Sequence, residues 1–81
     1  MNESEIRIAV FCGIASVLDV YPEAVEAESK EVSMSDELDS LDAVELAMLV
    51  ESQLSIELKD SEIKLEWTPE EFVQYIFKTY Q

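Results

Sequence analysis

LDSLDAVELAMLVESQL, residues 38–54, runs without glycine or proline and predicts a helix from about Ser40 to Leu54. At about 100° per residue, the apolar side chains of this helix fall on two opposite sides. The side that we expect to face a core carries Ala43, Leu46, Ala47, Val50 and Leu54, and the opposite side carries Leu41, Val44 and Met48. A helix that is apolar on two sides is either enclosed between neighbours or displays one side to a partner.

Carboxylates on the second side decide between these alternatives. Glu45 and Glu51 lie beside the apolar residues Leu41, Val44 and Met48. Burying these carboxylates without partners would cost several kcal/mol each. We therefore predict that this side is displayed, with the apolar side chains giving contact area and the acids giving orientation against Lys and Arg of a partner.

Two further helices are predicted on either side of this one. The first runs from Asn2 to about Leu18, and Asn2 with Glu5 fits a capping box. The apolar positions of this helix are Ile6, Val10, Ile14 and Val17. The last helix begins at Thr68-Pro69-Glu70-Glu71, which combines a capping Thr, Pro at the first helical position and Glu at the third. Its apolar face consists of Phe72, Ile76 and Tyr80.

The connections between these helices differ in length. Tyr21-Pro22 ends the first helix, and we expect a long loop from there to Leu38, pinned by Val25, Val32 and Met34. Asp60 to Leu65 allows only a short helical turn, from which Ile63 and Leu65 reach the core. The predicted fold class is all-α. Residues 1–81 are expected to form a single domain, a small bundle of three longer helices and one short helix with a long loop between the first two longer ones.

The charge balance limits the class of partner. The 81 residues include nineteen acidic and five basic ones, which gives a formal charge of -14. Such a charge repels nucleic acid and anionic membrane surfaces and favours a positively charged protein surface. We therefore expect neither a nucleic acid nor a membrane as partner. The single cysteine, Cys12, and the lack of a basic and apolar leader at the N-terminus indicate the cytoplasm.

Ser40 lacks the neighbours that a catalytic serine needs. The chain has no histidine, and no lysine lies near Ser40 in the sequence, so a self-activated nucleophile is not expected. A calcium-binding EF-hand frame starting at Asp36 would place Leu41 at the tight-turn glycine and Ala47 at the bidentate glutamate, which excludes that metal site. Ser40 either caps the helix, a role that Asp39 also fits, or is a hydroxyl that another enzyme modifies.

The stretch from Leu38 to Leu54 closely resembles the prosthetic-group segment of acyl carrier proteins, and the likeness extends over essentially the whole chain. It implies that Ser40, between Asp39 and Leu41, carries 4'-phosphopantetheine through a phosphodiester, and that the fold is a small four-helix bundle. It also implies that partner enzymes recognise the helix after Ser40, through Leu41, Asp42, Val44, Glu45, Met48 and Glu51.

The resemblance implies a carrier with no catalytic residue of its own. A thiol-ended arm would hold an acyl group as a thioester at high effective concentration for each partner. One implied partner is a holo-carrier-protein synthase, a phosphopantetheinyl transferase that moves the arm from coenzyme A with magnesium. The others are an acyl- or aminoacyl-loading ligase and a downstream acyltransferase or synthase with a basic docking surface. The carrier itself is expected to be a monomer.

Two departures from the family pattern bear on the cargo. Fatty-acid carriers commonly have Gly-Ala or a similar small pair before Asp-Ser-Leu, whereas this chain has Glu37-Leu38. EWTPEEFVQYI, residues 66–76, resembles D-alanyl carrier proteins, but these usually follow the serine with Phe or Met and then Gly, not Leu41-Asp42. We therefore predict a specialised acyl, lipid or polyketide-type pathway, with an aminoacyl carrier and an unmodified acidic adaptor as alternatives. Ala43 and Ala47 either leave room for a chain inside the bundle or only let helices approach closely.

Overall fold

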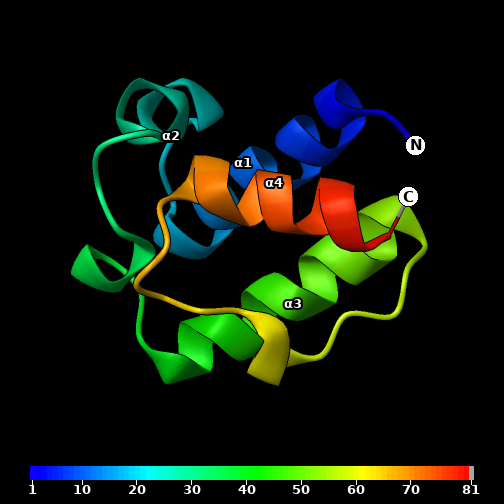
Figure 1. The fold of residues 1–81 in the computed structure, drawn as a ribbon. Coiled ribbons are helices and arrows are strands. Elements are labelled where there is room, and N and C mark those ends of the chain that lie inside the picture. The colour runs from blue at the N-terminus through cyan, green and yellow to red at the C-terminus, as the bar shows by residue number, and fades with distance from the viewer. Residues whose placement is uncertain (81) are drawn as a thin grey trace.

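The computed structural model describes residues 1–80 and contains four α-helices, with no strand among these residues. The elements are α1 (Glu3–Leu18), α2 (Pro22–Glu28), the 3₁₀ turn η1 (Met34–Asp36), α3 (Ser40–Leu54), the 3₁₀ turn η2 (Asp60–Glu62) and α4 (Pro69–Thr79). In the view of Figure 1, α4 lies in front of α1, α3 lies below them, and α2 lies at the end of the molecule away from both termini. The all-α class predicted from the sequence is confirmed.

The predicted starts of α1 and α4 are both confirmed by reciprocal hydrogen bonds. At α1, Asn2 Oδ1 accepts from the backbone N–H of Glu5 at 2.8 Å, and the Glu5 carboxylate accepts from the N–H of Asn2 at 3.3 Å. At α4, Thr68 Oγ1 accepts from the N–H of Glu71 at 3.2 Å, and the Glu71 carboxylate accepts from the N–H of Thr68 at 2.8 Å. These bonds satisfy N–H groups that the first turn of a helix leaves without intrahelical partners.

The predicted loop between Tyr21 and Leu38 is wrong in one respect, because seven of its residues form α2. Pro22 lies in the first turn of α2, so it begins a helix as well as following the end of α1. Val25 is the only buried hydrophobic side chain of α2, so the sequence shows no helical apolar pattern there. The short fourth helix of the bundle is therefore α2, and the turn expected near residue 60 is η2.

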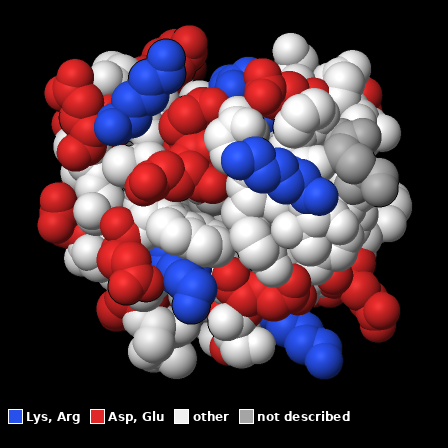
Figure 2. All heavy atoms as spheres, in the orientation of Figure 1, with Lys and Arg blue, Asp and Glu red and all other residues white. Residues whose placement is uncertain are grey.

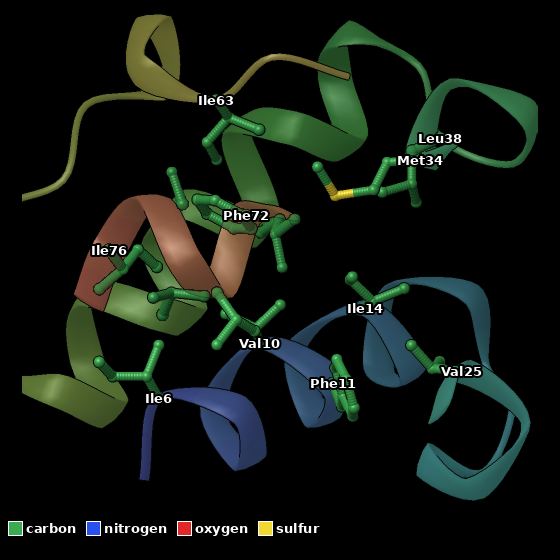
Figure 3. Packing of buried hydrophobic residues seen from close by; sticks show 14 of the residues in the cluster. Ile6, Val10, Phe11, Ile14, Val25, Met34, Leu38, Ile63, Phe72 and Ile76 are labelled. Atoms are coloured by element: carbon green, nitrogen blue, oxygen red, sulfur yellow. The ribbon is translucent and has the colours of Figure 1, made fainter. Parts of the chain in front are cut away.

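The helices share one apolar core, and α1 packs against each of the other three (Figure 3). The largest fully buried side chains are Phe72, Ile6, Leu46, Leu58, Ile76, Val10, Val50 and Val73. The predicted inward side of α3 is confirmed, since Ala43, Leu46, Ala47 and Val50 are buried and Leu54 is half-buried against the core. Val25 of α2 belongs to the same core, and the connecting segments contribute Met34, Leu38, Leu58 and Ile63.

Gly13 marks the closest approach of α1 to α3. A Cβ at this position would lie 2.9 Å from Cδ1 of Leu46, a side chain that is fully buried. Real Cβ atoms essentially never approach another carbon so closely, so the absence of a side chain at Gly13 lets the two helices pack directly. This contact holds α3, and with it Ser40, against the centre of the bundle.

Backbone hydrogen bonds hold the segment before α3 against the segment before α4. The N–H of Met34 donates to the carbonyl of Trp67 at 2.8 Å, and the N–H of Ser35 donates to the carbonyl of Leu65 at 2.7 Å. Further along, the N–H of Leu38 donates to the carbonyl of Met34 at 2.7 Å, and the Leu38 side chain is buried. The chain therefore enters α3 from a fixed position.

Within residues 1–80, no single helix is both long enough and apolar enough to cross a bilayer. By length and composition alone, α1 and α2 taken together would meet that requirement, although they are bent by 110° at the break between them.

Candidate functional site

Ser40 is the first residue of α3, and Asp39 before it caps the helix. One carboxylate oxygen of Asp39, Oδ1, accepts from the N–H groups of Leu41 and Asp42, both at 3.0 Å. The carboxylate of Asp42 accepts in return from the N–H of Asp39 at 3.0 Å. Of the two candidate caps in the sequence, Asp39 therefore performs this role, and the Ser40 hydroxyl is not required for it.

The Ser40 side chain is exposed. Among residues 1–80, no side-chain or backbone group forms a hydrogen bond with its hydroxyl, and the sequence has no histidine that could act as its base. The hydroxyl also lies at the N-terminal end of a helix of 15 residues, where the helix dipole favours a phosphate. The hydroxyl is therefore accessible from outside, and the chain has no histidine to activate it.

The outward side of α3 is exposed next to Ser40, as the sequence predicts. Leu41 is 79% exposed, Met48 is 63% exposed and Val44 is 40% exposed. Glu45, which lies among them, is also exposed. We call Leu41, Val44, Glu45 and Met48 the outer face of α3. Its combination of apolar area and carboxylate suits contact with a protein that presents apolar and basic groups.

Two carboxylates of α3 that the family resemblance assigns to recognition also hold the structure together. Asp42 completes the cap with Asp39. Glu51 is half-buried, and its Oε2 accepts from the N–H of Leu58 at 2.9 Å. This bond ties the last turn of α3 to the buried Leu58 side chain, a contact that the sequence did not indicate. A role of Glu51 in recognition therefore stays a prediction.

The electrostatic surroundings of the site are strongly negative. From Glu31 to Leu58 the chain has eight acidic residues and no basic one. Figure 2 shows Asp and Glu side chains distributed over the visible face of the molecule, with only a few Lys and Arg among them. Nevertheless, no three His, Cys, Asp or Glu side chains within residues 1–80 are grouped so that they could hold a metal ion. The lone Cys12 is exposed on α1.

The sequence of this chain is similar to those of known proteins. The family model described as "Phosphopantetheine attachment site" matches residues 12–76, a range that includes Ser40. A protein of Chlorobium luteolum named acyl carrier protein is 36% identical over 80 residues, covering 96% of this chain and 99% of that relative. Acyl carrier proteins of Thermosynechococcus vestitus and Wolinella succinogenes are 37% and 41% identical, covering 94% and 85% of this chain and 93% and 95% of theirs. No solved structure matches the chain significantly.

Proposed function

This chain belongs to the acyl carrier protein family, and we propose that Ser40 is the residue to which its 4'-phosphopantetheine arm is attached. The arm supplies a terminal thiol that holds an acyl group as a thioester. The observation that carries the assignment is the position of the Ser40 hydroxyl, which is exposed at the start of α3 while Asp39 does the capping. Ser40 also lies within the residues that match the attachment-site family.

The attachment reaction needs a partner enzyme, because this chain has no histidine and no lysine near Ser40 in the sequence. In the transfer from coenzyme A, a bond forms between Ser40 Oγ and the phosphorus next to pantetheine. The pyrophosphate bond breaks, and adenosine 3',5'-bisphosphate leaves. The serine proton passes to a base of a phosphopantetheinyl transferase, and magnesium bound by that enzyme neutralises the phosphates. Ser40 and the start of α3 are thus a substrate for this reaction, and the carrier catalyses no step.

We assign the docking of partners to the outer face of α3. Leu41, Val44 and Met48 are large apolar side chains exposed within the eight residues that follow Ser40, and Glu45 adds a charge among them. A transferase, a loading ligase or a downstream acyltransferase that presents basic residues around an apolar patch would bury this face and bring its active site to Ser40.

The choice of cargo rests on less specific features. Leu38 is 4% exposed in the core, and Trp67 packs against Phe72 and Tyr75 with ring centroids 6.3 and 5.1 Å apart. Leu38 departs from the usual sequence of fatty-acid carriers, and Trp67 belongs to the stretch that resembles D-alanyl carriers. Because each of these residues has a packing role, neither one distinguishes the two classes of cargo. We propose a specialised acyl pathway, with aminoacyl loading as the alternative.

Mass spectrometry tests the attachment residue directly. After incubation with coenzyme A, magnesium and a broad-specificity phosphopantetheinyl transferase, the wild type should gain one arm and Ser40→Ala should gain none. Glu45→Lys should gain the arm more slowly than wild type, because it opposes the basic surface of the transferase. Glu57→Lys, the same charge change on an exposed residue beyond the end of α3, is the matched control and should react at the wild-type rate.

The outcome separates the carrier from the unmodified adaptor. An unchanged mass of the wild type would refute the assignment of Ser40. Addition of the arm to Ser40→Ala would show that the arm is attached to another residue. Equal slowing by Glu45→Lys and Glu57→Lys would show that net charge, and not the outer face of α3, controls docking.

A further inference from the structure

We propose that a groove between α1 and α2 binds a segment of a partner protein that presents a large apolar side chain between basic residues. The groove consists of two adjoining hollows of about 350 and 400 Å³, which share Arg7, Phe11 and Glu26 in their walls. Each is more than twice the volume of an engineered cavity of about 150 Å³ that binds benzene, so a side chain as large as Phe fits. The groove is a second docking surface, separate from the outer face of α3.

The first hollow of the groove is mainly apolar. Ile8, Phe11 and Cys12 of α1 and Pro22 of α2 line it. Ile8 is 60% exposed, and among the large apolar side chains of α1, all of which the structure describes, it is the one that the bundle leaves exposed. The others are buried or half-buried because α1 packs against α2, α3 and α4. An apolar side chain that covers Ile8 and fills this hollow would remove apolar surface from water, which favours association.

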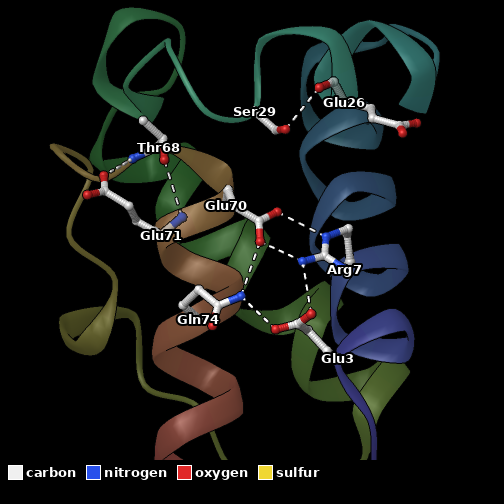
Figure 4. Close-up of polar contacts among 8 residues, drawn as sticks. All are labelled: Glu3, Arg7, Glu26, Ser29, Thr68, Glu70, Glu71 and Gln74. Carbon is white, nitrogen blue, oxygen red and sulfur yellow. Dashed lines mark hydrogen bonds and ion pairs between the residues drawn. The ribbon is translucent and has the colours of Figure 1, made fainter.

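Carboxylates without partners lie at the edge of the same hollow. Glu23 and Glu26 of α2 line it and are exposed, and neither carboxylate is bonded to another group within residues 1–80. Arg7 does not neutralise them, because its guanidinium turns toward Glu70 and Glu3 (Figure 4). Over the whole groove, the acidic lining residues are Glu23, Glu26, Glu31 and Glu70, and the basic ones are Arg7 and Lys30. This balance complements an apolar side chain flanked by Lys or Arg.

A second copy of this chain complements the groove poorly. Each copy would bring a formal charge of -14 to the contact. In a symmetric contact, Glu23 and Glu26 of one copy would meet the same carboxylates of the other, and like charges placed opposite one another oppose association. The charge also opposes contact with an anionic membrane. A basic protein segment gains from the same charge that repels these two alternatives.

The groove and the outer face of α3 lie on opposite sides of this pair of helices. Gly13 of α1 packs against Leu46 of α3. On α1, Ile8 and Phe11 lie about 140–160° from Gly13, at about 100° per residue. On α3, the apolar residues of the outer face lie about 140–160° from Leu46 by the same geometry. A partner in the groove therefore leaves Ser40 free for a second enzyme and keeps the carrier close to it at high effective concentration.

A designed peptide can probe the groove by NMR. The peptide is a helix with Leu and Phe on one face and Lys on the other, which is a common form of groove-binding segment. It should shift the methyl resonances of Ile8 and the backbone resonances of Phe11 and Cys12 with one affinity. Binding to the outer face of α3 would shift Val44 and Met48 as a separate set. A peptide with Glu in place of Lys should shift neither set, and the proposal fails if the Lys peptide leaves Ile8, Phe11 and Cys12 in place.

Two pairs of matched variants test the apolar and the charged parts of the groove. Ile8→Glu should weaken peptide binding to the groove at least about tenfold. Val20→Glu makes the same change at a 45% exposed residue outside the groove and should have no effect. Glu26→Lys should weaken binding about threefold, whereas Glu28→Lys should not, because both residues are exposed on α2 but only Glu26 lines the groove. Equal losses within either pair would overturn the proposal.

The same resonances identify two other occupants. Shifts of Ile8 and Phe11 that grow with protein concentration, without peptide, would show that a second copy occupies the groove. Shifts caused by phosphatidylcholine vesicles, and not by the Lys peptide, would show that a membrane covers it. Either result would overturn the proposal of a basic protein partner.

Cys12 allows the effect of an occupied groove on Ser40 to be measured. It lines the groove and is the only cysteine of the sequence, so a peptide with a thiopyridyl-activated cysteine forms one mixed disulfide there and releases pyridine-2-thione. With acetyl-coenzyme A, whose thiol is blocked, the transferase should load Ser40 of the tethered protein as fast as that of Cys12→Ala, which takes no peptide. Slower loading of the tethered protein would show that the two surfaces overlap and would overturn their independence. If neither protein is loaded, the carrier assignment fails, whereas the peptide shifts of Ser40→Ala still decide whether the groove binds.

Discussion

At the scale of single residues, Asp39 and Ser40 divide two tasks between them. Asp39 accepts two backbone N–H groups of α3, whereas the Ser40 hydroxyl accepts none. Asp39→Ala should therefore lower the free energy of unfolding by about 1 kcal/mol. Ser40→Ala should change it by less than about 0.5 kcal/mol, as expected for an exposed side chain without such a role. Urea unfolding of both variants in the form without the arm measures this difference, and equal losses would show that the serine shares the cap.

The residues that could be predicted from the sequence are those whose position follows from local helix geometry. Helical periodicity alone separates Leu41, Val44 and Met48, on the exposed side of α3, from the buried Leu46 and Val50. The bond between Glu51 and Leu58 could not be predicted in this way. It crosses the end of α3, where Ser55 adopts a left-handed conformation with φ of 57°, and no periodic pattern continues through such a turn.

At the scale of elements, helices with strong start signals or wide apolar faces could be predicted, and the short α2 could not. The first turns of α1 and α4 have complete capping boxes, and Asn2 and Thr68 in the sequence predict both of them. In contrast, α2 has seven residues and one buried hydrophobic side chain, Val25. Packing against α1 holds it in place, and a contact between elements leaves no trace in local sequence pattern.

The pairing of α1 with α4 includes an ion pair whose strength depends on pH (Figure 4). Arg7 Nε donates to Glu70 Oε1 at 2.9 Å, and the amide of Gln74 donates to both Glu70 and Glu3. The hydrogen bond from Arg7 holds the pKa of Glu70 below its ordinary value of 4.5. Because the folded-state pKa is the lower one, the pair stabilises the fold above pH 4.5 and loses this contribution as the pH falls through the folded-state pKa.

Glu70→Gln should therefore be less stable than wild type at pH 7 by about 1 kcal/mol, the usual limit for a partly exposed pair. The difference should narrow as the pH falls below 4.5, when the wild-type carboxyl also becomes neutral. Glu57→Gln is the control, since it removes one acid from an exposed position without breaking an ion pair. Urea unfolding at several pH values measures the effect, and a constant difference between wild type and Glu70→Gln from neutral to acid pH would contradict it.

At the scale of the whole molecule, the all-α bundle could be predicted because each long helix carries its own signal. In addition, the sequence has only one glycine and two prolines, too few for a fold rich in tight turns. That residues 1–81 form a single domain stays a prediction, and Gln81 lies outside the described residues. A monomeric state and a cytoplasmic location are likewise predictions, as is the class of basic partner enzymes.

The net charge of -14 should make the stability of the fold depend on salt, because this charge is confined to a molecule of 27 × 23 × 19 Å. At 0.01 M ionic strength the screening length is about 30 Å, so every carboxylate repels every other one across the whole bundle. At 1 M it is about 3 Å, and only immediate neighbours interact. Unfolding separates the charges, so low salt favours the unfolded chain.

The melting temperature should consequently rise with sodium chloride. Relief of about 1 kcal/mol of repulsion corresponds to about 4–8 °C for a domain of this size. Sucrose at matched osmolality separates screening from a general effect of added solute, because it favours compact states without shielding charge. A larger rise with sodium chloride than with sucrose is expected, and magnesium chloride should also raise the melting temperature. If sodium chloride and sucrose had equal effects, the repulsion between carboxylates would already be balanced within the folded structure, and the acidic surface would then serve docking at no cost to stability.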